Sequence, residues 1–374
     1  MLKKSLALFI ILSLIFSIFL AGCTNNTPTN TDQRTITGTD ADAETDTNAN
    51  NSINSDNSAI ERGNILTFGE TSLDGKFNPI ISDSTYDGYV VDLMFDALVD
   101  NTPEGEPKAD VAERWEISED GKIYTFYLKK GIRFHDGHEL TAEDVQFTYE
   151  TIAHPDYNGP RWSTMQDVVG AQEFRDGKAD HVDGIKIIDE YTISFTTKEI
   201  NAPKIINDFI YEILPKHYYQ FEDFNDFIAL NQNPMGSGPF KFVRYVVGQY
   251  LEIEANEEYF KGRPKLDGVI VKIVPAETIP TELQAGVIDI GQLTQLPEDV
   301  EIATETGIVD IQQFTGNGYT YVGINLRRDK FKDKRVRQAL MYGLNRRAFI
   351  DSHYEGYAEP CNTAVSPVSW AYKR

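Results

Sequence analysis

The sequence predicts a mixed α/β protein with two lobes, in which pairs of strands are inserted between helices. Short apolar runs of strand length alternate along the chain with segments of helical periodicity. Turn residues such as Asp120-Gly121 join neighbouring strand-like runs into pairs. Residues 64–374 are also numerous enough to form two lobes, each with a core of its own. These three observations define the fold class.

The first residues have the pattern of a secretory signal. Lys3 and Lys4 precede an apolar run, which small residues follow. The run is shorter than the ~20 residues that span a bilayer, and no basic cluster follows it, so a transmembrane anchor is the weaker interpretation. Residues 20–23 (LAGC) resemble the bacterial lipobox, whose cysteine is lipidated. The resemblance implies that residues 1–22 are a signal peptide and that Cys23 is the lipid attachment site.

Charge and cysteine content exclude two classes of protein. The formal charge of −23 becomes −25 when a signal containing Lys3 and Lys4 and no acidic residue is removed. Such a surface repels nucleic acid and anionic lipid, so we expect no nucleic-acid partner. Attachment to the membrane is then expected through the lipid at Cys23. With this cysteine modified, the chain retains too few cysteines for a disulfide framework.

Residues 23–63 are predicted to be a disordered tether behind the lipidated cysteine. The segment is rich in Thr, Asn and Asp and contains no aromatic residue. It cannot bury enough apolar surface to offset the entropy of ordering its backbone. As a flexible coil it spans roughly 35 Å, so the folded body is expected to stand clear of the bilayer.

Local patterns predict the secondary structure of the body. Thr141 is the expected N-cap of a helix, and Asp144 at the third helical position completes a variant of the capping box. Residues 236–240 (GSGPF) are interpreted as a turn that leads into a strand. The predicted elements are a strand at 65–70, helices at 86–100, 141–153 and 333–351, strand pairs at 116–134, 182–198 and 240–256, a strand at 267–275, and a helix running into a strand at 278–291.

Motifs of enzyme chemistry are absent from the sequence. It contains no Gly-x-Ser-x-Gly, Walker, His-Glu-x-x-His or Cys-x-x-Cys pattern. Residues 134–140 (FHDGHEL) contain His135 and His138, and imidazole suits transition metals. The Asp136-Gly137 pair, however, favours a tight turn in which His135 bonds to the backbone and His138 is solvated. We therefore predict no metal, no cofactor and no enzymatic activity.

Several blocks of sequence resemble a known family. Residues 112–150 (AERWEISEDGKIYTFYLKKGIRFHDGHELTAEDVQFTYE) are similar to the signature block of extracytoplasmic solute-binding protein family 5, the substrate-binding lipoproteins of peptide and nickel ABC transporters. Later blocks agree in order and spacing. They are GSGPFKF at 236–242, NEEYFKGRPKLDGVIVKIVP at 256–275, LQAGVIDIG at 283–291 and YVGINLRRDKFKDKRVRQALMYGLNR at 321–346. The resemblance extends from about residue 64 to the last residue.

The resemblance implies a periplasmic-binding-protein-like fold of type II, an α/β two-lobe flytrap with an inserted β-rich subdomain. It implies that residues 64–85 and 205–310 form lobe I, that 86–204 form the inserted subdomain, and that 311–374 begin lobe II. Members of the family continue beyond the position that corresponds to residue 374, at the C-terminal end. We therefore expect a C-terminally truncated chain with an incomplete second lobe, which binds peptides weakly or not at all.

The resemblance also implies a function. The protein is expected to be the lipid-anchored substrate-binding component of an ABC importer, monomeric and located on the extracytoplasmic face of the bacterial cell membrane. It is expected to capture oligopeptides or dipeptides and to deliver them to the permease subunits. The alternatives are a nickel, haem or oligosaccharide binder of the same family, a surface hydrolase whose carboxylate pair the sequence does not reveal, and a structural lipoprotein.

Candidate solute-binding residues follow from the position of strand ends. Ligands of open α/β sheets bind beyond the carboxyl ends of the strands. This rule selects Glu70, Thr71, Gln292, Leu293, Asn317, Tyr319 and Tyr321. The resemblance implies that the inserted subdomain contributes Trp162. The structural alternatives are that the tyrosines belong to the core, that Trp162 packs on its own subdomain, and that Glu70 caps a helix.

Overall fold

The structure, a computed structural model, describes residues 63–103, 105–294, 296–313, 319–355 and 357–363. The predicted signal peptide, Cys23, the tether up to residue 62, and Asn317 lie outside the described residues. Within the described ranges, no helix has both the length and the apolar character needed to cross a bilayer.

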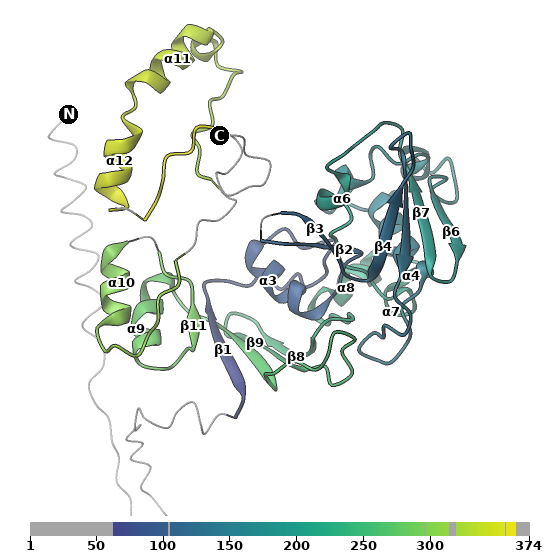
Figure 1. Ribbon diagram of the computed structural model, residues 1–374, viewed down its shortest axis with the longest axis horizontal. Coiled ribbons are helices and arrows are strands. Elements are labelled where there is room, and N and C mark those ends of the chain that lie inside the picture. The colour runs from purple at the N-terminus through teal and green to yellow at the C-terminus, as the bar shows by residue number, and fades with distance from the viewer. Residues whose placement is uncertain (1–62, 104, 295, 314–318, 356, 364–374) are drawn as a thin grey trace, which may run out of the picture. The chain divides into compact units, whose positions relative to one another are not determined.

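A five-stranded mixed sheet is built from residues that are far apart in the sequence. Its order is β11-β1-β10-β9-β8. The strands are β1 (Ile65–Glu70), β8 (Phe240–Val246), β9 (Tyr250–Ala255), β10 (Gly268–Ile273) and β11 (Ile290–Gly291). β1 runs parallel to both β10 and β11, whereas β9 is antiparallel to its neighbours β10 and β8. The carboxyl ends of three parallel strands therefore lie side by side, with β1 in the middle (Figure 1).

A second sheet is antiparallel throughout, with the order β4-β5-β7-β6. Its strands are β4 (Ala112–Ile117), β5 (Ile123–Leu128), β6 (Ile185–Asp189) and β7 (Thr192–Thr196). Tyr124, Phe126 and Leu128 of β5 are buried, and the residues between them are more exposed, which is the alternation of a strand with one face on the core. A short ribbon pairs β2 (Val99–Asn101) with β3 (Pro107–Ala109).

Helices connect and cover these strands. The predicted capping box is present at the start of α4 (Ala142–Ala153), where Thr141 and Asp144 satisfy each other's backbone N–H groups. The other helices are α3 (Thr85–Met94), α5 (Ala171–Arg175), α6 (Lys204–Asn207), α7 (Lys216–Tyr219), α8 (Phe224–Ala229), α9 (Ile279–Gln284), α10 (Pro297–Thr304), α11 (Lys334–Gly343) and α12 (Arg346–His353). Single 3₁₀ turns are η1 (Trp162–Thr164), η2 (Leu230–Gln232), η3 (Ala276–Thr278) and η4 (Asp329–Phe331).

Two helices end earlier than the sequence patterns indicate. The helix predicted at 86–100 ends at Met94, because Phe95 is extended and the N–H of Gly238 donates to the Met94 carbonyl at 2.9 Å. A β-carbon on Gly238 would lie 2.4 Å from the Met94 carbonyl carbon, so only glycine permits this approach. The helix predicted at 333–351 is divided into α11 and α12, because Asn345 caps a new helix at the Ala348 N–H.

Buried hydrophobic residues form two clusters. The larger one includes Phe126 and Phe195 of the antiparallel sheet together with Leu251 and Val269 of the mixed sheet. The smaller one consists of Val274, Ile279, Leu283 and Ile288. The strands of the mixed sheet lie within 64–85 and 205–310, the segments predicted as lobe I. The strands of the antiparallel sheet lie within 86–204, the predicted insertion. Because both sheets contribute to one core, the boundaries between these segments stay a prediction.

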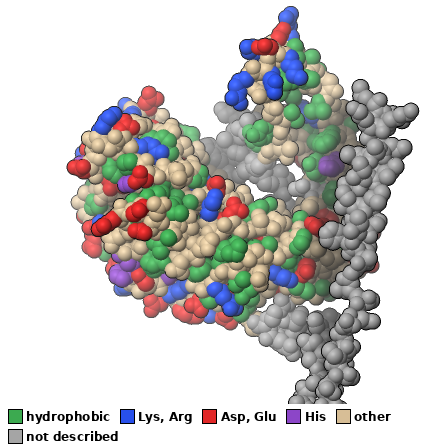
Figure 2. Space-filling view, turned by 180° about the vertical axis from the view of Figure 1, so that it is seen from behind, with side chains coloured by type: hydrophobic (Ala, Val, Ile, Leu, Met, Phe, Trp, Pro, Cys, Tyr) green, Lys and Arg blue, Asp and Glu red, His purple; other side chains and the backbone are tan. Residues whose placement is uncertain are grey.

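The segment with α11 and α12 differs from the rest of the chain in charge and burial. Lys and Arg are frequent from 327 to 347, and blue side chains gather around α11 in Figure 2. Apolar side chains of the segment predicted as a helix at 333–351 are exposed, with Val336 at 40% and Leu340 at 51%. From 319 to 363, none of the described residues belongs to the buried hydrophobic set.

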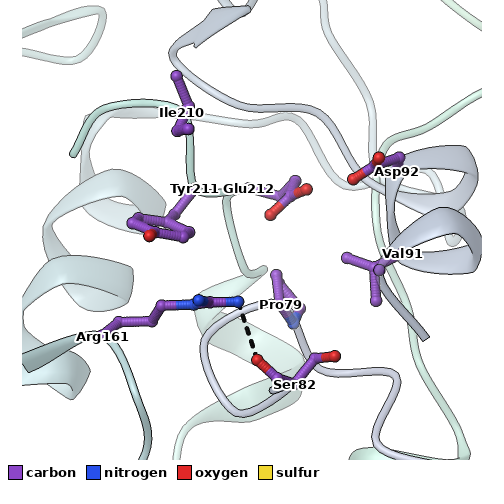
Figure 3. A pocket seen from close by; sticks show the side chains of 9 residues that line it. Pro79, Ser82, Val91, Asp92, Arg161, Ile210, Tyr211 and Glu212 are labelled. Carbon is purple, nitrogen blue, oxygen red and sulfur yellow. Dashed lines mark hydrogen bonds between the residues drawn. The ribbon is translucent and has the colours of Figure 1, made fainter. Parts of the chain in front are cut away.

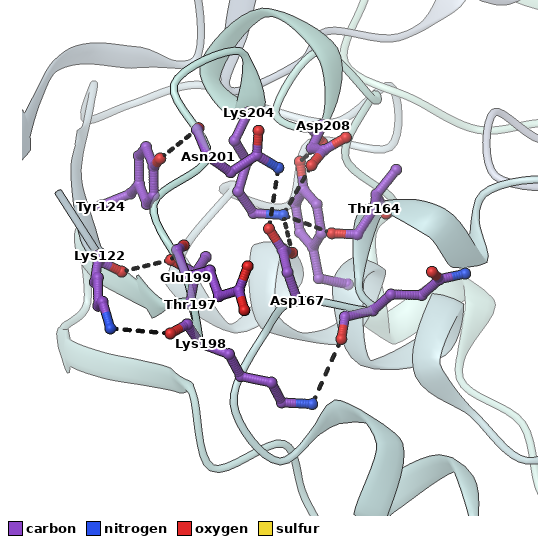
Figure 4. A network of polar contacts seen from close by, with 12 residues as sticks. Lys122, Tyr124, Thr164, Asp167, Thr197, Lys198, Glu199, Asn201, Lys204 and Asp208 are labelled. Atoms are coloured by element: carbon purple, nitrogen blue, oxygen red, sulfur yellow. Dashed lines mark hydrogen bonds and ion pairs between the residues drawn. The ribbon is translucent and has the colours of Figure 1, made fainter.

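A buried lysine joins α6 to the residues that follow η1 (Figure 4). Lys204 is 1% exposed, and its Nζ donates to Asp167 Oδ1 at 2.7 Å and to Asp208 Oδ2 at 2.8 Å. It donates a third hydrogen bond to the Thr164 carbonyl at 2.7 Å. All three protons of the ammonium are thus used, and the two carboxylates compensate its charge inside the protein.

Candidate functional site

The carboxyl ends of β1, β10 and β11 bring four of the predicted site residues together. Glu70 is the last residue of β1, and Thr71 follows it. The register pairs Gly69 with Gly291 of β11, so Gln292 and Leu293 continue beside Glu70 and Thr71. On the other side, Glu70 pairs with Ile273, the last residue of β10. We refer to Glu70, Thr71, Gln292 and Leu293 as the strand-end site.

Two glycines position the smaller hydrophobic cluster directly against these strands. A β-carbon on Gly69 would lie 2.5 Å from Ile288 Cδ1, and one on Gly291 would lie 2.8 Å from Ile279 Cγ2. The absence of side chains at these paired positions lets Ile279 of α9 approach the strand backbone. Leu293 is partly buried and packs against the same cluster. The loop after β11 is therefore held close to the strand-end site.

Glu70 is the most unusual group of the strand-end site. Its side chain is buried, and Oε1 accepts hydrogen bonds from the backbone N–H of Thr71 at 2.7 Å and from the Thr71 hydroxyl at 3.3 Å. Oε2 is also buried and has no hydrogen-bond partner among the described residues. Leaving a buried acceptor unpaired costs about 1–3 kcal/mol. Glu70 thus offers an acceptor for an N–H or ammonium donor. Thr71 lies outside any helix, so Glu70 is not a helix cap.

The remaining predicted residues make their described contacts elsewhere. Tyr319 and Tyr321 are 45% and 75% exposed, and their ring centroids lie 5.9 Å apart. Trp162, in η1, is partly buried against the larger cluster, and the guanidinium carbon of Arg175 lies 4.4 Å from a Trp162 ring centroid. Arg175 lies in the segment predicted as the inserted subdomain, as Trp162 does, so these contacts agree with the structural alternative for Trp162. Gln292 is exposed.

The histidine turn at 134–139 has the predicted hydrogen bond to the backbone. His135 Nε2 lies 3.1 Å from the carbonyl oxygen of Gly238, and its backbone N–H donates to the carbonyl of Gly236. Burial lowers the pKa of His135 to about 4, although the Gly238 carbonyl partly opposes the shift. The imidazole is therefore neutral and joins this turn to the glycine-rich turn. His138 is exposed, as predicted.

A cavity of about 190 Å³ contains a pair of carboxyl groups that the sequence did not reveal. In Figure 3, Asp92 of α3 and Glu212 direct their carboxyl groups toward each other. Arg161 lines the same cavity and donates to the carbonyl of Ser82 at 2.8 Å. Burial, followed by the neighbouring Asp92 charge, raises the pKa of Glu212 well above its usual value. Asp92 and Glu212 are distant in a chain with 58 acidic residues, so no local pattern pairs them.

Comparison with known proteins identifies the family. The model of the family described as bacterial extracellular solute-binding proteins, family 5 Middle, matches residues 106–374, which is more than half of the chain. The chain belongs to this family. Proteins of family 5 are extracytoplasmic substrate-binding proteins of ABC transporters.

Individual relatives extend the similarity of this family 5 chain over its full length. It is 28% identical to the oligopeptide-binding protein AppA of Bacillus subtilis (strain 168) over 377 residues, which cover 100% of this chain and 63% of AppA. It is 30% identical to the heme-binding protein A of Haemophilus influenzae over 275 residues, which cover 70% of this chain and 49% of that protein. The chain therefore spans about half to two thirds of the length of these relatives.

A solved structure confirms the predicted fold. The structure of AppA from Bacillus subtilis in complex with a nonapeptide matches with a TM-score of 0.71 and 31% sequence identity, covering 83% of this chain and 60% of that one. The family 5 chain thus has the periplasmic-binding-protein-like, type II α/β fold that the sequence blocks implied.

Proposed function

We propose that this family 5 protein is the lipid-anchored substrate-binding component of an ABC importer, which captures oligopeptides or dipeptides outside the membrane and delivers them to the permease. The observation that carries the proposal is the alignment of the whole chain with the oligopeptide-binding protein AppA, whose solved structure with a nonapeptide has the same fold. Binding closes two lobes over the solute, and no bond of the solute is made or broken.

The strand-end site has the chemistry that such a function needs. An extended peptide presents N–H groups, carbonyl oxygens and a terminal ammonium. The unpaired Oε2 of Glu70 can accept from one of these donors, and the amide of Gln292 can both donate and accept. Because the contacts are made to the backbone and the terminus of the peptide, the protein contacts the peptide side chains little, and peptides of many sequences can bind. We propose that Asn317, Tyr319, Tyr321 and Trp162 complete the solute contacts.

The proposal includes the organisation of the chain. Residues 1–22 are the signal peptide, and Cys23 carries the lipid that anchors the tether at 23–63 to the extracytoplasmic face of the membrane. Residues 64–85 and 205–310 form lobe I, 86–204 form the inserted subdomain, and 311–374 begin lobe II. The protein acts as a monomer in this arrangement.

Two alternatives each have one supporting observation. A haem binder is supported by the 30% identity to heme-binding protein A. A surface hydrolase is supported by the Asp92–Glu212 carboxyl pair, because a carboxyl group with a raised pKa can act as a general acid. The alignment over the whole chain favours peptide binding over both.

Native mass spectrometry of the full chain separates these possibilities. The protein is mixed with an equimolar pool of dipeptides to nonapeptides and haem, and the retained molecules are identified after release. We expect peptides of varied sequence, recovered at their original masses. Retention of haem alone would contradict the proposal in favour of the haem binder. Recovery of shortened peptides that disappear with Glu212→Gln would favour the hydrolase.

A further inference from the structure

Three side chains that can bind a metal meet where the histidine turn at 134–139 contacts α7. Asp136 and His138 belong to the turn, and His217 belongs to α7. His217 lies 81 residues beyond Asp136 in the sequence. One ligand atom from each residue can be chosen so that all three lie within 4.8 Å of one another. None of these residues belongs to the strand-end site.

The distances are close to those of a metal centre. Asp136 Oδ2 lies 2.6 Å from His217 Nε2 and 3.0 Å from His138 Nδ1. The two imidazole rings lie 3.9 Å apart, at an angle of 31°. Around a tetrahedral Zn²⁺ with bonds of about 2.0–2.1 Å, two ligand atoms are roughly 3.3 Å apart. To bind an ion, Asp136 exchanges its hydrogen bonds to the two imidazoles for a bond to the metal, and the stacked imidazole rings move apart so that both nitrogens face the ion.

The backbone holds both parts of this cluster in position. In the turn, the N–H of His138 donates to Asp136 Oδ1 at 3.1 Å, which fixes the carboxylate. At α7, the N–H of Lys216 donates to Asp144 Oδ1 at 2.8 Å, and Oδ2 of the same carboxylate accepts from the Thr141 N–H at 2.9 Å. The capping box of α4 thus also anchors the residue before His217. Ligands on such fixed backbone lose little freedom when a metal binds.

The ligand types select the class of metal. Two imidazoles and one carboxylate suit divalent first-row transition metals, whereas Ca²⁺ and Mg²⁺ prefer sites made only of oxygen ligands. The side chains of Asp136, His138 and His217 are 30%, 65% and 33% exposed, so an ion can enter and keep water at its open positions.

We propose, contrary to the prediction of no metal made from the sequence of this turn alone, that Asp136 and His138 together with His217 form a binding site for a divalent transition-metal ion of the Zn²⁺ class. The bound ion joins the histidine turn to α7 and stabilises the fold, because it binds the folded chain and not the unfolded one. This site is separate from the residues assigned to solute binding, so the proposal does not depend on which solute the protein carries.

Calorimetric titration of the untagged full chain with ZnCl₂ tests the proposal. We expect one tight ion per chain and a higher melting temperature with ZnCl₂. His138→Gln and His217→Gln should each weaken binding by about tenfold or more and remove the thermal shift. The matched control is His181→Gln, which changes an exposed histidine that also faces a carboxylate, Asp183 at 3.2 Å. This variant and Glu70→Gln should bind Zn²⁺ like the unchanged chain.

Two results would overturn the metal site. One is unchanged Zn²⁺ affinity in the His138→Gln/His217→Gln double variant, and the other is no saturable binding by the unchanged chain up to about 1 mM ZnCl₂. Circular dichroism identifies any variant that fails to fold, and His138→Gln remains informative because this side chain is exposed. X-ray absorption of the Zn²⁺ complex should show two imidazole nitrogens at about 2.0–2.1 Å, and a shell of oxygens alone would contradict the assignment.

Discussion

The backbone N–H of Thr71 donates a hydrogen bond of 2.7 Å to Oε1 of Glu70, whereas Oε2 of the same carboxylate is buried and has no partner in the described part of the chain. One oxygen is therefore fixed by the protein and the other remains an acceptor for a donor from outside. Because Glu70 ends the middle one of three parallel strands, this acceptor lies where an α/β sheet binds its ligands.

The approach of Ile288 to Gly69 predicts a large effect of a side chain at this glycine. Gly69→Val places a β-carbon about 2.5 Å from Ile288 Cδ1 and should destabilise the fold by about 1–3 kcal/mol through overpacking. Urea unfolding measures the difference. Gly88→Ala is the control, because nothing lies within 4 Å of its added β-carbon and helical alanine should be neutral or stabilising. Equal stability of Gly69→Val and the unchanged chain would contradict the described packing.

Removing the ammonium group of Lys204 should lower the stability of the fold, because this group compensates the charges of two carboxylates. Lys204→Met keeps the length of the side chain but leaves Asp167 and Asp208 together without a cation, so a loss of about 3 kcal/mol is expected in urea unfolding. Lys186→Met at an exposed position is the control and should change stability by less than about 0.5 kcal/mol. A similarly small change in Lys204→Met would mean that the network contributes nothing.

The raised pKa of Glu212 predicts a pH-dependent effect of neutralising it. The pKa of Glu212 is higher in the folded chain than its unfolded value of about 4.3. The protonated group therefore contributes its full stabilisation below about pH 4.3, and this contribution is lost as the pH rises through the folded-state pKa. Glu212→Gln should therefore be more stable than the unchanged chain at pH 7 and similar to it near pH 4. Unfolding in urea across this range gives the comparison. A difference that does not vary with pH would contradict the shared burial of the two carboxyls.

The contribution of His135 to stability depends on pH in the opposite direction to that of Glu212. Its folded pKa of about 4 lies below the usual value of 6.5, so its contribution is complete above pH 6.5 and is lost as pH falls to about 4. At 1.36 kcal/mol per pKa unit, the loss is at most about 3 kcal/mol. His135→Gln should flatten the stability profile over this interval, and His181→Gln should not. Identical profiles for the two variants would show that His135 is not buried in its neutral form.

Local patterns predicted most elements, because period-two alternation and capping residues act within a few positions. The strands from Ile65 to Glu70 and from Ile123 to Leu128 and the Thr141–Asp144 box are confirmed in this way. The end of α3 at Met94 was missed, because Gly238, far along the chain, determines it.

For the candidate sites too, the sequence predicted what depends on neighbouring residues and missed what depends on residues far apart in the chain. The strand-end rule selected Glu70 and Gln292, and parallel pairing of β1 with β11 brings them to one edge. It does not define the contacts of Trp162, Tyr319 or Tyr321, which depend on the arrangement of separate segments. The pairing of Asp92 with Glu212 and of Asp136 with His217 joins residues from distant parts of the chain, so no spacing in the sequence indicates it.

Peptide binding through the strand-end site is the central claim, and calorimetry with one nonapeptide tests it most directly. The unchanged chain of residues 1–374 should bind the peptide saturably, although weakly because its second lobe is expected to be incomplete, and should release it at its original mass. Glu70→Gln, which preserves the shape of the side chain and removes its charge, should weaken binding by about tenfold, whereas the exposed-site control Glu119→Gln should not. Equal affinity of Glu70→Gln and the unchanged chain, or conversion of the peptide during the titration, would contradict the account.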